Sequence, residues 1–105
     1  MVYYYKSFEE IDWKSARIVA DPERLPAERE TYTTMNEETD IAEINAMSKV
    51  WIKHLSQHPE FTCDPKGVTC MKDRNGNEII VEIKGTLPKN CIRTSIRPRK
   101  RFDRL

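Results

Sequence analysis

The segment GVTCMKDRNGNEIIVEIKG, residues 67–85, decides the fold, because it has the pattern of two strands joined by a tight turn. Asn75 and Gly76 both tolerate the positive φ angles of a two-residue type I′ turn. The turn predicts a register with Val68 opposite Ile83, Cys70 opposite Val81 and Lys72 opposite Ile79. One face of the hairpin is then mostly apolar, while the pairs Thr69 with Glu82 and Met71 with Ile80 point to the other face.

A third strand is predicted after this hairpin, over residues 91–97. Apolar or small residues alternate there with arginine and serine, in the order Cys91, Ile92, Arg93, Thr94, Ser95, Ile96, Arg97. Such a strand would present its arginines outward and continue into an extended basic arm, residues 98–105. We therefore expect a two- or three-stranded antiparallel sheet over about residues 67–97.

A long amphipathic helix is predicted over about residues 37–58, before the hairpin. Its apolar residues recur at steps of three and four until Pro59: Ile41, Ile44, Met47, Trp51, Ile52 and Leu55. Asn36 or Asp40 can cap its start. Its polar side, which includes Lys49, Lys53, Ser56 and Gln57, is interpreted as solvated. The expected fold class is α+β, with this helix packed on the small sheet.

The N-terminal part predicts a shorter helix, over about residues 8–20. Ser7 and Glu10 have the spacing of a capping box, and apolar residues follow at helical positions. Val2–Tyr5 is either an edge strand or an aromatic stripe that packs on a neighbour. Residues 21–35 show no period and contain two prolines, so we expect a linker or an extended arm. The whole chain, residues 1–105, is expected to form one small domain.

The amino-acid composition indicates in which cellular compartment the protein is expected. The longest aliphatic run, Ile79–Val81, is far shorter than the ~20 apolar residues of a membrane span, so no membrane contact is expected. No signal-peptide pattern opens the sequence. The three cysteines, Cys63, Cys70 and Cys91, are an odd number, which favours reduced thiols over a disulfide framework. We therefore expect a cytoplasmic or other reducing intracellular compartment.

Charge is divided along the chain. Residues 1–60 contain 7 Lys/Arg and 12 Asp/Glu, a net charge of −5, whereas residues 61–105 contain 11 and 5, a net charge of +6. The candidate residues for binding a nucleic acid or an acidic partner lie near the C-terminus: Arg93, Arg97, Arg99, Lys100, Arg101 and Arg104. Three interpretations stay open for them: contact with nucleic acid, contact with an acidic protein surface, which includes a second copy of this chain, or a solvated tail.

Aromatic residues are the candidates for a protein interface, since Trp, Tyr and Arg are enriched at binding hot spots. They are Tyr3, Tyr4, Tyr5, Trp13 and Phe102.

A zinc site is one chemical hypothesis. His54 and His58 lie one helical turn apart and are followed by Cys63 and Cys70, which are ligand types for tetrahedral zinc. Six residues separate the two cysteines, whereas zinc-binding pairs usually sit two to four apart. The alternative interpretation is a pair of histidines at a helix end and two buried thiols. No cofactor is therefore expected.

A metal-dependent nuclease is the second chemical hypothesis. Asp64 on one strand and Glu82 and Lys84 on the next supply two carboxylates and an ammonium, groups that hold Mg²⁺ and stabilise developing charge. In order and spacing these residues resemble the PD-(D/E)xK nucleases. The resemblance covers about 21 residues, and Pro65 follows the aspartate instead of preceding it.

The expected function is therefore a non-enzymatic binding protein. It would act as an accessory subunit of a macromolecular assembly, or as a small regulator or inhibitor, for example a viral one, that docks on a protein or nucleoprotein surface. The alternatives are a minimal Mg²⁺-dependent nuclease and a small zinc-binding module for nucleic acid.

Overall fold

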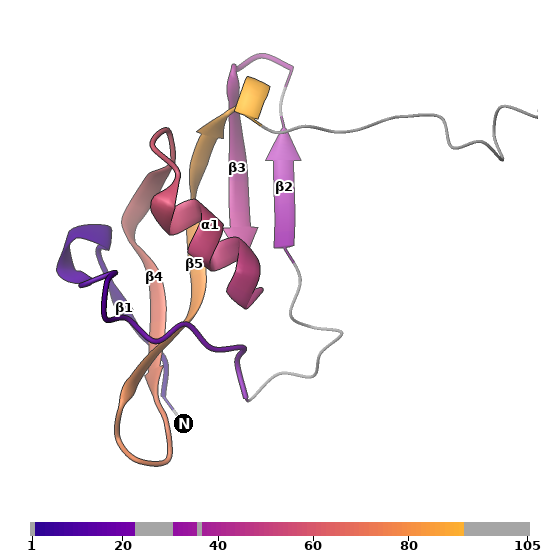
Figure 1. Cartoon of the computed structure of the whole chain (residues 1–105). Coiled ribbons are helices and arrows are strands. Elements are labelled where there is room, and N and C mark those ends of the chain that lie inside the picture. Colours follow the sequence, from indigo (N-terminus) through magenta and orange to yellow (C-terminus); the bar gives the residue numbers. More distant parts are fainter. Residues whose placement is uncertain (1, 23–30, 36, 92–105) are drawn as a thin grey trace, which may run out of the picture.

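The described part of the chain forms a five-stranded antiparallel sheet with one α-helix on one of its faces (Figure 1). The computed structural model describes residues 2–22, 31–35 and 37–91. Along these residues the elements are β1 (Tyr4–Lys6), a 3-10 turn (Phe8–Glu10), β2 (Thr31–Met35), β3 (Ile41–Ala46), α1 (Lys49–Gln57), β4 (Thr62–Lys72), β5 (Glu78–Pro88) and a second 3-10 turn (Lys89–Cys91). The strand order across the sheet is β1-β4-β5-β3-β2.

The connection from β3 to β4 passes over one face of the sheet. Both strands are antiparallel to β5, which lies between them, so β3 and β4 run in the same direction. Figure 1 shows α1 crossing this face in front of β3 and β5. We call it the helix face, and the opposite side the helix-free face.

The predicted long helix over 37–58 is wrong, and so is the small sheet on which it was to pack. The range contains β3 and a nine-residue helix, α1. In β3, Ala42, Ile44 and Ala46 are buried and alternate with more exposed residues, a period of two that fits a strand. Pairing with both β2 and β5 then satisfies the β3 backbone along both edges.

The predicted N-terminal helix over 8–20 is wrong as well, because only Phe8–Glu10 is helical, as a 3-10 turn. The Ser7–Glu10 pairing does form: the Glu10 carboxylate accepts hydrogen bonds from the Ser7 amide (3.1 Å) and hydroxyl (2.6 Å). Further along, the backbone bonds to β5 instead of to itself. The Val19 amide donates to the Ile80 carbonyl (3.0 Å), and the Ile80 amide donates to the Arg17 carbonyl (2.8 Å).

The predicted two- or three-stranded sheet gains strands on both sides. Tyr4–Lys6 pairs with β4, so the edge-strand interpretation of the N-terminal aromatic run holds. Thr31–Met35, within the range predicted as linker or extended arm, forms β2. The strand predicted over 91–97 begins at Cys91, which instead ends the second 3-10 turn. The rest of that strand and the basic arm lie outside the described residues.

The hairpin of β4 and β5 forms with a different turn. The Gly76 amide donates to the Asp73 carbonyl (3.0 Å) and the Asp73 amide to the Asn77 carbonyl (2.8 Å), with Gly76 at φ +80°. This is a three-residue loop closed by a glycine in the left-handed region. The register near the turn therefore shifts by one, to Lys72 opposite Glu78 and Cys70 opposite Ile80.

A β-bulge at Val81 then restores the predicted register. Beyond it Thr69 lies opposite Glu82 and Val68 opposite Ile83. The bulge also redistributes the apolar residues of β5 between the two faces. Ile80 and Ile83 enter the main core, while Ile79 and Val81 join Met71 in a second cluster. The hairpin is thus apolar on both faces, and not on one as predicted.

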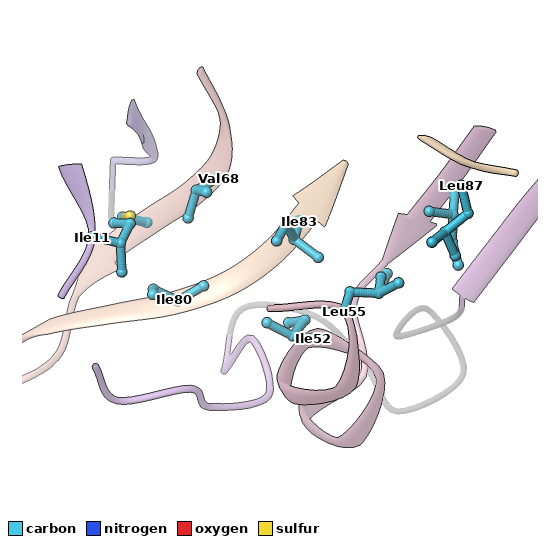
Figure 2. Close-up of a cluster of buried hydrophobic side chains, with 10 residues drawn as sticks. Ile11, Ile52, Leu55, Val68, Ile80, Ile83 and Leu87 are labelled. Atoms are coloured by element: carbon cyan, nitrogen blue, oxygen red, sulfur yellow. The ribbon is translucent and has the colours of Figure 1, made fainter. Parts of the chain in front are cut away.

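The main core lies between the helix face and α1. Figure 2 shows Ile52 and Leu55 of α1 close to Ile83 of β5, with Leu87 further along the same strand and Val68 on the neighbouring strand β4. Ile11 and Ile80 extend the same cluster towards the N-terminal segment. A second, smaller cluster of Met71, Ile79 and Val81 lies apart from the main core, and Tyr3 and Val19 pack against it.

Candidate protein-binding interface

The edge strand β2 is one of the two strands of the described fold that lack a partner strand on one side. It lies last in the strand order and pairs with β3 alone. Its sequence, TYTTM, contains no charge, and every residue after Thr31 is exposed. Four of its five residues are of types that favour strands. We call Thr31–Met35 the β2 edge.

Exposed apolar side chains surround the β2 edge. Tyr32 and Met35 belong to it and are 50% and 46% exposed. Ile41 on β3 and Trp51 on α1 are 52% and 49% exposed. Ile41 shares a hollow with Thr34, and Trp51 shares another with Thr31 and Thr33. Apolar surface therefore flanks the edge on both faces of the sheet.

The hollow on the helix face has a volume of about 460 Å³. Its lining combines Thr31 and Thr33 with Ile44, Trp51 and Leu55, so it lies between β2 and α1. A separate hollow of about 300 Å³ lies on the helix-free face, beside the one that Ile41 lines. It is more polar, and its lining includes Tyr32, Asn45, Asp64 and Lys84. Side chains of an added strand would point alternately into these two hollows.

Two buried polar atoms in this region have no hydrogen-bond partner among the described residues. They are Oγ1 of Thr31, on β2, and Oδ1 of Asn45, on β3. Asn45 lies opposite Tyr32 in the β2–β3 ladder. A buried polar atom without a partner costs free energy, so a donor brought by a bound partner would be favourable at either atom.

The aromatic residues predicted as an interface have different environments. Tyr4 and Trp13 pack against the main core, and Tyr3 packs against the second cluster. The Tyr3 hydroxyl also donates a 2.6 Å hydrogen bond to the buried carboxylate of Asp21. Tyr5, at 57%, is the most exposed of these four. Phe102 and the six predicted cations from Arg93 to Arg104 lie outside the described residues.

The predicted zinc ligands do not come together. Cys70 is fully buried in the main core, whereas His54 and His58 line the hollow beside β2. Burial raises the pKa of both Cys63 and Cys70 to about 11, which disfavours the thiolate that zinc requires. Among the described residues, no group of three His, Cys, Asp or Glu side chains is arranged to hold a metal ion.

The predicted nuclease residues are only partly brought together. Asp64 and Lys84 line the same hollow on the helix-free face, and Glu43 of β3 lines it too. Glu82 is 6% exposed, does not line this hollow, and accepts a hydrogen bond of 3.1 Å from the buried Thr69 hydroxyl. The Glu-x-Lys pair thus splits into a buried carboxylate and an exposed ammonium.

No helix in the described ranges has the length and apolar character needed to cross a membrane. Comparison of the chain with protein-family models, with curated proteins and with solved structures finds no match.

The β2 edge was missed by the sequence reasoning. The signal was present in TYTTM, a run of strand-forming residues, but charged residues and prolines precede it and dominate residues 21–30. The alternation of Ala42, Ile44 and Ala46 was the second signal, and the helical spacing of the larger apolar residues obscured it.

Proposed function

We propose that this protein is a non-enzymatic binding protein that takes up an extended segment of a partner protein along the β2 edge. The observation that carries the proposal is the outer side of β2, which pairs with no strand among the described residues. Such an edge presents a row of backbone N–H and C=O groups, and the group that matches this row is another extended backbone.

The two edges of the sheet differ in how open they are to pairing. At the other edge, β1 has three residues, ends in the charged Lys6 and is followed at once by the turn that Ser7 and Glu10 stabilise. Short and charged edge strands resist pairing with a foreign chain. The β2 edge is longer and uncharged, so it is the edge suited to a partner.

The unpaired atoms Thr31 Oγ1 and Asn45 Oδ1 support the same location. Both lie on β2 or opposite it, where an added strand and its side chains would bring donors. A partner that donates to them would recover the free energy lost on their burial.

The surroundings of the edge define the chemistry of the partner. Glu37, Asp40 and Glu43 are exposed at and near the β2–β3 connection, while β2 itself carries no charge. Apolar residues line much of the hollow on the helix face, and Ile41 contributes an apolar side chain on the other face. The partner segment should therefore be extended, should alternate in polarity and should carry Lys or Arg near the acidic connection.

In this proposal the protein acts as an accessory subunit or a small regulator. Its binding makes an extended segment of the partner inaccessible to other proteins. We place it in a reducing, cytoplasmic-type compartment, which the three free cysteines favour.

Selection from a displayed library of random peptides about twelve residues long tests the proposal. We expect selected peptides to contain β-branched residues at alternate positions together with Lys or Arg. Bound peptide should slow amide hydrogen exchange in residues 31–35 and leave β1 unchanged. The double variant Tyr32→Lys/Thr34→Lys should lose binding, because it places cations on the strand that the peptide must join.

The matched control is Tyr5→Lys/Asn77→Lys, which adds the same charge at exposed sites away from β2. It should bind the peptides as the wild type does. Failure to select any peptide, or protection of a strand other than β2, would overturn the proposal. So would a dimer in sedimentation that Tyr32→Lys/Thr34→Lys dissociates, because the occupant of the edge would then be a second copy of this chain.

A further inference from the structure

A groove of about 590 Å³ lies between α1 and the segment Trp13–Val19. Figure 1 shows this segment below α1, and the backbone of Arg17 and Val19 hydrogen-bonds to Ile80 of β5. The side chains used in the argument are Trp13, Lys14, Arg17, Lys49, Lys53 and Ser56. We call this hollow the basic groove. It lies on the opposite side of α1 from Trp51 and His54, which line the hollow beside β2.

The charge of the basic groove is of one sign. Four of its lining residues are cationic and none is acidic. Arg17 is paired with Asp73, at 3.0 Å, so its charge is partly compensated. Lys14, Lys49 and Lys53 are exposed and form no ion pair with any residue that the structure describes. Three uncompensated cations in one groove attract an anionic ligand.

The cations lie on both walls of the groove. Lys49 and Lys53 are four residues apart on α1, so they project one above the other on the same side of the helix. Lys14 comes from the facing segment. A ligand that carries several negative charges in a row can pair with all three cations, whereas a single charge cannot balance them. A linear polyanion satisfies this requirement.

Hydrogen-bond donors and an aromatic ring in the groove favour phosphate over carboxylate chains. The Gln57 amide can donate to phosphate oxygens, whereas the Ser56 hydroxyl already donates to the Lys53 carbonyl (2.8 Å). The partly exposed Trp13 offers an indole on which a base can stack. Lys49 is the first residue of α1, and the Ser48 side chain forms no capping hydrogen bond. The positive end of the helix therefore adds to the potential at the groove.

We infer that the basic groove binds the phosphate backbone of single-stranded nucleic acid. A groove with cations on two facing walls holds one chain of phosphates, which is the arrangement that single-strand binding proteins use. This site goes beyond the proposed function and is independent of it, because the β2 edge would bind a peptide. Together the two sites would let the chain dock on a nucleoprotein surface.

The experiment uses the full chain and fluorescently labelled homopolymeric oligonucleotides of thymidine and of uridine, about 15 nucleotides long, in an anisotropy titration. The variant is Lys49→Glu/Lys53→Glu; both side chains are exposed, and a carboxylate at position 49 is favourable in the first turn of the helix, so the fold should persist. The control is Lys66→Glu/Arg74→Glu, which changes the net charge equally at exposed sites outside the groove. The cations between Arg93 and Arg104 are present in every variant, so the comparison isolates the groove.

We expect the groove variant to weaken binding by about tenfold or more, and to reduce the slope of log affinity against log salt by about 1.4, since single strands give about 0.7 per phosphate contact. The control should change the affinity much less and keep the slope. If the two variants weaken binding equally, the affinity depends only on the net charge of the protein and not on the groove, and the inference is overturned. Absence of binding to either oligonucleotide, or equal binding of poly-glutamate, would also overturn it.

Discussion

The hydroxyl of Tyr4 donates a hydrogen bond of 2.6 Å to the carboxylate of Glu78, and so ties β1 to the start of β5 across 74 positions of sequence. Lys6 contacts the same carboxylate at 3.4 Å. Partial burial and this hydrogen bond raise the pKa of Tyr4, and the same hydrogen bond is the main reason that the pKa of Glu78 lies below its ordinary value. The short edge strand β1 is thereby fixed to the hairpin by side chains as well as by its backbone.

Tyr4→Phe should lower the free energy of unfolding by about 1–2 kcal/mol. The substitution keeps the ring that packs against the main core and removes only the hydrogen bond to a charged group. Urea denaturation would measure the loss. Tyr5→Phe is the control, because the Tyr5 side chain is exposed, and it should stay within about 0.5 kcal/mol of the wild type. An unchanged midpoint for Tyr4→Phe would show that the hydrogen bond adds nothing.

The contribution of Glu78 should depend on pH. Because the folded protein lowers the pKa of this carboxyl from its ordinary 4.5, its contribution is complete above that value and is lost as the pH falls through the lower folded value. The difference in unfolding free energy between wild type and Tyr4→Phe should therefore shrink from neutral pH to about pH 3. Chemical denaturation at both pH values tests this. A gap that is the same at both would contradict the link to Glu78.

At two glycines, Gly76 and Gly85, the substitutions Ala and Asn should rank in opposite orders of stability. A Cβ at Gly85 would clash with the Thr62 carbonyl oxygen and the Phe61 ring, whereas Gly76 has open space but a φ of +80°. Ala should destabilise both, by about 1–3 kcal/mol at Gly85 and about 1–2 kcal/mol at Gly76. Asn should be better than Ala at Gly76, because it tolerates this φ, and worse than Ala at Gly85.

Denaturation midpoints of the four single variants would test this order. The reverse order at Gly85, with Asn the more stable, would mean that the Phe61 ring moves aside at little cost. A milder effect of Ala than of Asn at Gly76 would show that the left-handed geometry is not what selects glycine there.

Cys91 should react slowly with alkylating reagents, and Glu60 should be the cause. The Cys91 thiol donates a hydrogen bond of 2.7 Å to the Glu60 carboxylate, and this contact raises the pKa of the thiol. Glu60→Gln removes the negative charge, so the thiolate fraction near neutral pH should rise and alkylation should quicken several-fold. Mass spectrometry after timed iodoacetamide treatment measures the rate for each cysteine.

Glu9→Gln is the matched control for this experiment, because it removes the same charge from an exposed site. The alkylation rate of Cys91 should be unchanged in it. Cys70, fully buried and with its pKa raised to about 11, should stay unreactive in all variants. An equal rate for Cys91 in wild type and Glu60→Gln would exclude the carboxylate as the cause.

In the hairpin, the predicted strand pairing forms even though the turn and one bulge each differ from the prediction. The sequence predicts Val68 opposite Ile83, and this pairing forms, yet the turn and the bulge at Val81 each displace the register by one, in opposite directions. The turn departs from the two-residue type because Asp73 accepts hydrogen bonds from the amides of Asn75 and Asn77, both at 2.9 Å. Such side-chain contacts favour the longer loop, and Asn-Gly alone does not reveal them.

The remaining elements could not be predicted from local sequence, because contacts between residues distant in sequence determine their conformation. Ile41, Ile44 and Met47 have helical spacing, but the backbone of β3 has strands available on both sides, and their hydrogen bonds decide its conformation. The same applies to residues 17–19, which bond to Ile80. Lys49 and Lys53 were placed on the polar side of a helix from sequence alone. That Lys14 faces them follows only from the fold.

The nuclease alternative gives the last prediction. A PD-(D/E)xK-like site needs Glu82 to share a metal ion with Asp64, but Glu82 is directed to Thr69 among buried residues, while Asp64 and Lys84 line an open hollow. Plasmid DNA incubated with the protein and Mg²⁺ or Mn²⁺ should therefore remain intact. Glu82→Gln keeps an acceptor for the Thr69 hydroxyl and should preserve the fold. Cleavage by the wild type that both Glu82→Gln and Lys84→Ala abolish would instead establish the nuclease, since Lys84 is exposed and its loss should leave the fold unchanged.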